Sequence, residues 1–218
     1  MKSSITIYLA GDSTVQTYGT SEEPQAGWGQ YLDRYVDEAV SISNHAIGGR
    51  SSKTFITEGR LEAISSEMNE TDYLLIQMGH NDSTKNKPER YTDPYTDYKQ
   101  YVRQYIEQAR RRKATPILIT PVGRLHYVRK EFLADFGDYC NAMKEVAEEE
   151  KVELIDLMAK SIAYYSSIGY EKTAELFMIS MNGTDCTHFT EKGAYMIAQL
   201  VAKEMKQLDD GISTYVTV

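Results

Sequence analysis

A serine, a histidine and an aspartate stand in this chain at positions that suit acyl transfer. Ser13 lies in Gly11-Asp12-Ser13-Thr14, directly after the apolar run Ile5–Ala10. Asp185 and His188 are three residues apart, a spacing that lets both side chains point the same way from a turn. Acyl transfer needs a nucleophile, a base within hydrogen-bond reach and a group that orients the base. The pattern predicts Ser13 as nucleophile, His188 as base and Asp185 as orienter.

The same reaction needs hydrogen-bond donors for the negative charge that develops on the carbonyl oxygen. The backbone N–H of Ser13, just past the apolar run, is free to donate. Gly49 offers a backbone N–H where a side chain would crowd the substrate. The Asn81 amide donates two hydrogen bonds without carrying charge. We therefore expect Ser13, Gly49 and Asn81 to form an oxyanion hole.

Each short pattern also has a simpler interpretation. Gly-Asp-Ser arises by chance in roughly one chain of this length in twenty, and Asp-x-x-His in roughly a quarter of them. Gly48-Gly49 alone is typical of a flexible turn, and Asn81-Asp82 of a turn after a strand. The hypothesis therefore depends on all four patterns occurring together, each at a strand end or in a late loop.

The elements that must position these residues alternate along the chain. Five short runs rich in β-branched residues are predicted strands: Ile5–Ala10, Val40–Asn44, Tyr73–Met78, Pro116–Thr120 and Val152–Ile155. Amphipathic stretches between and after them are predicted helices near 27–37, 59–69, 94–113, 135–151 and 190–208. Alternating strands and helices imply right-handed crossovers and a parallel sheet covered on both faces. The predicted fold is α/β, a three-layer α/β/α sandwich with a five-stranded parallel sheet, and its carboxyl edge is where ligands bind.

Length and composition narrow the class of protein. The 218 residues predict a single domain over 1–218, because no repeat, linker or low-complexity tract divides them. A net charge of −8 argues against nucleic acid as a partner. No stretch approaches the roughly 18 apolar residues of a membrane span, and nothing ahead of the first strand reads as a signal peptide. We expect a cytoplasmic protein without a membrane partner, with Cys140 and Cys186 reduced.

Beyond the separate patterns, the chain resembles the SGNH (GDSL-type) hydrolases. The four blocks of that family match Gly11-Asp12-Ser13, Gly49, Asn81 and Asp185-x-x-His188. Further segments resemble its rhamnogalacturonan acetylesterase branch: Tyr8-Leu9-Ala10-Gly11-Asp12-Ser13-Thr14, Gly27-Trp28-Gly29-Gln30-Tyr31-Leu32, Gly49-Arg50-Ser51, Glu58-Gly59-Arg60 and Gly79-His80-Asn81-Asp82. The resemblance implies a flavodoxin-like three-layer fold, the SGNH hydrolase fold, and ester hydrolysis without a metal or other cofactor. It implies the same roles for Ser13, His188, Asp185, Gly49 and Asn81.

The residue patterns predict a serine esterase, and the resemblance implies an acetylesterase acting on rhamnogalacturonan-derived oligosaccharides in pectin degradation. Six residues are candidates for lining the substrate cleft: Trp28, Arg50, Arg60, His80, Arg124 and His126. Rhamnogalacturonan carries galacturonate, so its fragments are anions, whereas the chain has a net charge of −8. Recognition must then come from local cations, for which the candidates are Arg50, Lys53, Arg60, Lys85, Lys87 and Arg124.

Three other functions stay open at this point. The triad does not specify the alcohol, so a lysophospholipase, a thioesterase or a generalist esterase would use the same scaffold. A metal-dependent hydrolase would take Asp12, Asp82, Asp185 and His188 as ligands and would lose activity with a chelator. A sugar-binding protein without catalysis would have no need of an oriented base.

Overall fold

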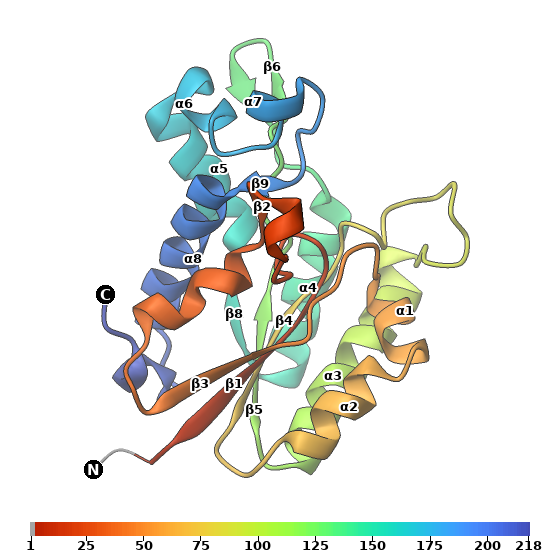
Figure 1. Ribbon diagram of the computed structural model, residues 1–218. Coiled ribbons are helices and arrows are strands. Elements are labelled where there is room, and N and C mark those ends of the chain that lie inside the picture. The colour runs from red at the N-terminus through yellow and green to blue at the C-terminus, as the bar shows by residue number, and fades with distance from the viewer. Residues whose placement is uncertain (1–2) are drawn as a thin grey trace.

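The computed structural model describes residues 3–218 and has a five-stranded parallel sheet at its centre (Figure 1). The strands are β1 (Ile5–Gly11), β3 (Val40–Asn44), β4 (Tyr73–Gln77), β5 (Thr115–Ile119) and β8 (Glu153–Ile155). Their order across the sheet is β3-β1-β4-β5-β8, and all neighbours are parallel. This is the flavodoxin-like order, in which ligands bind where neighbouring connections diverge, here between β1 and β4. The five predicted strands are confirmed.

Helices cover both faces of the sheet because successive residues of each strand point to opposite sides. Ile7 and Leu9 of β1 belong to a core formed with α5 (Leu157–Ile168), α8 (Glu191–Met205) and the 3₁₀ helix η2 (Trp28–Tyr35). Tyr8 and Ala10 belong to the opposite core. That core includes side chains of α1 (Ser52–Thr57), α2 (Arg60–Glu67), α3 (Lys99–Arg111) and α4 (Gly137–Glu150).

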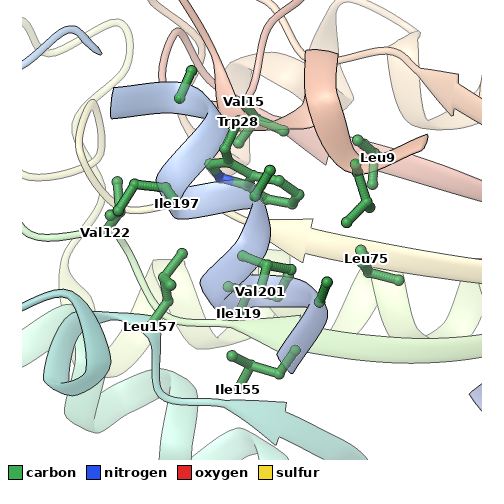
Figure 2. Packing of buried hydrophobic residues seen from close by; sticks show 14 of the residues in the cluster. Leu9, Val15, Trp28, Leu75, Ile119, Val122, Ile155, Leu157, Ile197 and Val201 are labelled. Atoms are coloured by element: carbon green, nitrogen blue, oxygen red, sulfur yellow. The ribbon is translucent and has the colours of Figure 1, made fainter. Parts of the chain in front are cut away.

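Helix α8 supplies the largest continuous apolar face of the first core. Its buried residues recur every three or four positions: Gly193, Ala194, Ile197, Ala198, Val201, Ala202 and Met205. Figure 2 shows Ile197 and Val201 among Leu9, Leu75, Ile119 and Ile155 of the strands, with Trp28 beside the helix. Burial of each large aliphatic side chain stabilises the fold by about 1.5–3 kcal/mol. This packing fixes the helix that follows His188.

Short elements gather around the carboxyl edge of the sheet. β2 (Gln25–Ala26) pairs antiparallel with β9 (Phe189–Thr190), and β6 (Tyr127–Val128) forms a hairpin with β7 (Glu131–Phe132). The remaining segments there are helical: η1 (Thr20–Glu22), η3 (Pro94–Tyr98), α6 (Tyr170–Ala174) and α7 (Ile179–Asn182). The 3₁₀ helix η4 (Ile212–Tyr215) lies at the opposite edge, where the Tyr215 hydroxyl donates to the Ser3 carbonyl at 3.3 Å. The β2–β9 pair links the segment after Ser13 to the segment after His188.

The predicted helices are found with two differences. The stretch 27–37 forms the 3₁₀ helix η2 rather than an α-helix, and α1, α5, α6 and α7 were not predicted. Cys140 and Cys186 are free thiols, and burial raises the pKa of Cys140 to about 12. Among the helices of residues 3–218, none combines the length and hydrophobicity of a membrane span.

Candidate active site

Ser13 lies in a tight turn directly after β1. The backbone N–H groups of Val15 and Gln16 both donate to the carbonyl of Asp12, each at 3.1 Å. A side chain at Gly11 would overlap Val15, since a Cβ built there lies 2.6 Å from a Val15 methyl group. The strand therefore ends in a turn that only glycine allows at that position, and the turn presents Ser13 beyond the sheet edge.

Ser13, His188 and Asp185 form a continuous chain of hydrogen bonds. Ser13 Oγ lies 3.0 Å from His188 Nε2, and His188 Nδ1 lies 2.8 Å from Asp185 Oδ2. A carboxylate can only accept, so Nδ1 carries the hydrogen and Nε2 is left to accept the serine proton. The hydrogen bonds expected from the Asp-x-x-His spacing are both present, and the geometry suits a nucleophile beside a general base.

Asp185 is held as a carboxylate by donors on both of its oxygens. Oδ1 accepts from the backbone N–H of Thr187 and of His188, at 2.9 and 3.0 Å. Burial alone would raise the pKa of Asp185, but these donors and the His188 ring outweigh it and lower the pKa. The group that orients His188 therefore stays ionised at neutral pH.

The position of His188 is fixed by the elements on either side of it. Its carbonyl accepts from the Met178 N–H at 2.8 Å, and Phe189 pairs with Ala26 across the β9–β2 ladder. Thr190 then caps α8, accepting from the Gly193 N–H at 3.3 Å. The catalytic histidine candidate therefore lies between a buried strand pair and a packed helix.

The glycine turn expected to supply an oxyanion-hole donor passes beside Ser13. A Cβ built on Gly48 lies 3.4 Å from Ser13 Cβ, so this backbone passes directly beside the nucleophile. Gly49 has a φ of +80°, in the left-handed region that favours glycine. Within residues 3–218 the N–H groups of Ser13 and Gly49 donate to no other group. Asn81 Nδ2 donates to the Arg50 carbonyl at 2.9 Å, which leaves its second hydrogen free.

A buried ion pair lies beneath the nucleophile turn. Asp12 is fully buried, and its Oδ1 accepts from the backbone N–H and the hydroxyl of Thr14, at 2.9 and 2.8 Å. His80 Nδ1 lies 3.0 Å from Asp12 Oδ2, and His80 Nε2 lies 3.0 Å from the Val122 carbonyl. Both ring nitrogens of His80 therefore face oxygen acceptors, one on Asp12 and one on the backbone. Burial would raise the pKa of Asp12, but His80 and Thr14 together lower it.

Trp28 does not line a cleft, contrary to the expectation from sequence. It is 1% exposed and its indole N–H donates to Gln77 Oε1 at 2.9 Å. Gln77 Nε2 in turn donates to the Thr14 hydroxyl at 2.7 Å, which donates to Asp12. Trp28 packs in the core (Figure 2) and supports the turn that holds Ser13 from below. His80, also proposed for the cleft, belongs to the same support.

Two of the arginines expected to bind substrate already share a carboxylate. Arg50 Nε and Arg60 Nε lie 3.0 and 3.1 Å from Glu58 Oε2. The guanidinium of Arg50 also donates to the Gly48 carbonyl at 2.8 Å, which braces the glycine turn. These arginines stabilise the segment between β3 and α2, and their charge is partly neutralised there.

Arg124 and His126 share a second carboxylate. Arg124 Nε lies 3.1 Å and His126 Nδ1 lies 2.8 Å from the two oxygens of Asp135. The three candidate lysines differ: Lys53 donates to the Pro88 carbonyl at 3.4 Å, while Lys85 and Lys87 are exposed. The structure therefore brings the cations to the expected edge of the sheet but pairs most of the arginines internally.

Three residues near Ser13 were missed from the sequence. The Tyr18 hydroxyl donates to the Ser13 carbonyl at 2.9 Å, and burial raises the pKa of Tyr18 to about 12. Gln16 Oε1 accepts from the Gly48 N–H at 2.6 Å. Arg90 Nη1 donates to the Gly49 carbonyl at 3.4 Å. Their proximity to Ser13 depends on loop folding, for which no local sequence pattern exists.

The ligands of the alternative metal site lie in separate networks. Asp12 pairs with His80, and Asp185 pairs with His188. Asp82 accepts from Ser52 and Thr92. Within residues 3–218, no group of three or more histidine, cysteine or acidic side chains gathers as a metal site requires.

Comparison with known proteins identifies the family. Residues 7–201 match the family described as GDSL-like Lipase/Acylhydrolase. The chain belongs to this family. It is 59% identical over 202 residues to the probable rhamnogalacturonan acetylesterase YesY of Bacillus subtilis (strain 168), covering 93% of each chain. It is 40% identical over 218 residues to the rhamnogalacturonan acetylesterase RhgT of the same organism, covering 95% of this chain and 92% of RhgT.

Solved structures confirm the SGNH hydrolase fold. Protein YXIM of Bacillus subtilis superimposes with a TM-score of 0.85 at 34% identity, covering 96% of this chain and 58% of that one. This chain therefore spans little more than half of that protein. Axe2, an acetylxylan esterase from Geobacillus stearothermophilus, has a TM-score of 0.69 at 14% identity, with 93% of this chain covered and 94% of Axe2. The chain is a carboxylic ester hydrolase of the GDSL type.

Proposed function

We propose that this chain is a carbohydrate acetylesterase that removes O-acetyl groups from rhamnogalacturonan-derived oligosaccharides. The observation that carries the proposal is the hydrogen-bonded series Ser13, His188, Asp185 in a chain 59% identical to a relative named a probable rhamnogalacturonan acetylesterase. The groups next to Ser13 are also polar: Gln16, Tyr18 and the Gly48 backbone. A polar surrounding favours a sugar over a long acyl chain.

In the proposed mechanism Ser13 Oγ attacks the acetyl carbonyl carbon while His188 Nε2 takes the serine proton. The imidazolium that forms is stabilised by Asp185, which remains ionised. The negative charge on the carbonyl oxygen is stabilised by the free N–H groups of Ser13 and Gly49 and by the second amide hydrogen of Asn81.

Collapse of the tetrahedral intermediate breaks the bond to the sugar oxygen. His188 returns its proton to that oxygen, so the deacetylated sugar leaves and an acetyl group remains on Ser13. A water molecule then attacks the acetyl-enzyme, with His188 again as base. The bond between the acetyl carbon and Ser13 Oγ breaks, His188 returns the proton to Oγ, and acetate is released. A role in pectin degradation and a cytoplasmic location stay predictions.

The test compares acetate release from acetylated rhamnogalacturonan oligosaccharides, acetylated xylan fragments and long-chain acyl esters. The proposal expects the first to have the highest kcat/KM, and Ser13→Ala to abolish release from all three. Labelling by a fluorophosphonate at Ser13, absent in Ser13→Ala, reports the nucleophile without reference to substrate. Equal or faster turnover of the neutral or long-chain esters, with labelling intact, would overturn the substrate and leave the hydrolase mechanism standing.

A further inference from the structure

Arg90 is an arginine beside the expected oxyanion hole that has no carboxylate partner. Its Nη1 donates to the Gly49 carbonyl at 3.4 Å and its Nη2 to the Thr84 hydroxyl at 3.3 Å. Its Nε is buried and makes no hydrogen bond within residues 3–218. Both of the bonds it does make are long and reach neutral oxygens. A guanidinium has five N–H donors in a planar fork, so most of this binding capacity is unused.

The neighbouring arginines do not share this property. Arg50 and Arg60 both pair with Glu58, and Arg124 pairs with Asp135. Of Arg50, Arg60, Arg90 and Arg124, Arg90 is therefore the one whose charge no carboxylate of residues 3–218 balances. An anionic ligand would supply the negative charge that balances the Arg90 guanidinium.

The guanidinium is also close to the reacting atoms. Arg90 contacts Gly49, and the preceding residue Gly48 lies against Ser13. Since consecutive Cα atoms are about 3.8 Å apart, the distance from the guanidinium to the Ser13 hydroxyl is on the order of 10 Å. Such a distance is spanned by one or two sugar rings, so both residues can contact the same oligosaccharide.

The segment that carries Arg90 is anchored at both ends. The Thr84 N–H donates to the Asn81 carbonyl at 3.2 Å, and the Thr92 N–H donates to the Asp82 carbonyl at 3.2 Å. The Thr92 hydroxyl donates to the buried Asp82 carboxylate at 2.8 Å. The guanidinium is thus positioned before a ligand arrives, which lowers the entropy cost of binding.

We propose that Arg90 binds the carboxylate of a galacturonate residue in the substrate and sets the preference for anionic oligosaccharides. The inference rests on the proposed function, because it takes a uronate-bearing sugar as the ligand. Nη1 and Nη2 would face the two carboxylate oxygens, the bidentate arrangement that suits a planar guanidinium. Arg90 is not among the arginines expected from the sequence to bind the carboxylate of the substrate.

The experiment uses one substrate in two forms. Acetylated rhamnogalacturonan oligosaccharides are compared with the same oligosaccharides after methyl esterification of their carboxylates, which removes the charge and keeps the sugar and acetyl groups. A hydrogen-bonded charge pair corresponds to a preference on the order of 10- to 100-fold, so the wild-type kcat/KM should favour the free acid by that factor. In Arg90→Gln the preference should fall to near one, and Arg90→Lys, without the fork, should recover only part of it.

The matched control is Arg111→Gln, which makes the same chemical change and the same change in net charge. Arg111 ends α3, at the opposite edge of the sheet from Ser13, and faces only the exposed Glu107. This variant should keep the wild-type preference. Circular dichroism and thermal unfolding of each variant establish that the fold is intact.

The possible failures are distinguishable. If Arg90→Gln keeps the preference for the free acid, Arg90 is not the carboxylate-binding residue. If the wild type releases acetate equally from both forms, the proposed function stands and carboxylate recognition is overturned. If the wild type turns over 4-nitrophenyl acetate but neither oligosaccharide, the proposed function fails and this inference fails with it.

Discussion

At the scale of single residues, two histidines near the nucleophile occupy opposite environments. His188 lies between a carboxylate and a hydroxyl, so one ring nitrogen donates and the other accepts. His80 lies between a carboxylate and a carbonyl, so both of its nitrogens donate. His188 can therefore take a proton from Ser13, whereas both ring nitrogens of His80 face acceptors and one of them holds the buried Asp12. In the sequence both histidines lie within motifs, and only their hydrogen-bond partners in the structure distinguish their roles.

We predict that Ser13 and His188 act as a unit. Ser13→Ala and His188→Ala should each remove nearly all esterase activity, because neither the nucleophile nor its base works without the other. The double variant should then be only slightly less active than either single variant. Rates with 4-nitrophenyl acetate measure this, and losses that multiply in the double variant would mean that the two residues do not share one step.

We predict that His80 contributes to stability through Asp12. Replacing His80 by Leu leaves Oδ2 of the fully buried Asp12 carboxylate without its partner, and breaking a buried pair of this kind costs roughly 3–5 kcal/mol. Urea unfolding at neutral pH should show a loss of that size. The control is His126→Leu, whose ring is 42% exposed and whose partner Asp135 keeps Arg124. Equal losses in the two variants would contradict the assignment.

At the scale of elements, Asp82 connects two helical segments that bracket the site. Its carboxylate accepts from the Ser52 N–H and hydroxyl at the start of α1, and from the Thr92 hydroxyl ahead of η3. Burial raises the pKa of Asp82 from 3.8 to about 6, in spite of these donors. An acid with a raised pKa is protonated more readily in the folded state, so its contribution to stability is present at low pH. That contribution is lost as pH rises through about 6.

We predict a pH signature for this carboxylate. Asp82 should make the free energy of unfolding fall by roughly 2 kcal/mol between pH 4 and pH 7, and Asp82→Asn should lack this component. The asparagine side chain has one acceptor oxygen fewer and does not titrate, so this loss changes the free energy of unfolding equally at every pH. Asp210, whose pKa burial also raises, is present in both proteins and cancels. Urea unfolding at pH 4, 5.5 and 7 gives the comparison, and parallel curves would contradict the prediction.

The sequence predicted secondary structure correctly where local residue patterns determine it. The strands were found because β-branched and other apolar residues are concentrated in short runs such as Ile5–Gly11. The stretch 27–37 has helical spacing, yet it forms a 3₁₀ helix packed tightly against the nucleophile turn. A Cβ on Gly27 or Gly29 would lie 2.3 or 2.5 Å from carbonyl oxygens of Gln16 and Val15. The spacing of apolar residues in the sequence does not reveal a tertiary contact of this kind.

The helix α5 was missed although a signal for it existed. Asp156 caps it by accepting from the Ala159 N–H at 3.2 Å, and its buried residues recur at helical spacing: Leu157, Met158, Ser161 and Tyr165. In the site, the local motifs located Ser13, Asp185 and His188. The place of Arg90 beside the site was not predictable, because its contact with Gly49 joins residues 41 positions apart.

At the scale of the whole molecule, the net charge of −8 opposes the proposed substrate. An anionic oligosaccharide approaching this surface meets long-range repulsion, while close to Ser13 it meets the unbalanced charge of Arg90. The two effects act over different distances. Salt weakens the long-range repulsion, since the Debye length falls from about 30 Å at 0.01 M to about 10 Å at 0.1 M. The contact between a half-buried guanidinium and a carboxylate is screened much less.

We therefore predict that added salt increases the rate with the anionic substrate. Between 10 and 150 mM NaCl, kcat/KM for free-acid rhamnogalacturonan oligosaccharides should rise by a few-fold, below the roughly 10-fold and larger effects of strong electrostatic steering. The methyl-esterified form should show no such rise, because it carries no charge to repel. Arg90→Gln should keep the salt dependence while losing the preference for the free acid, since the repulsion arises from the whole surface. A fall of kcat/KM with salt would instead mean that attraction to the cations at the sheet edge, and not repulsion by the net charge, governs the approach of substrate.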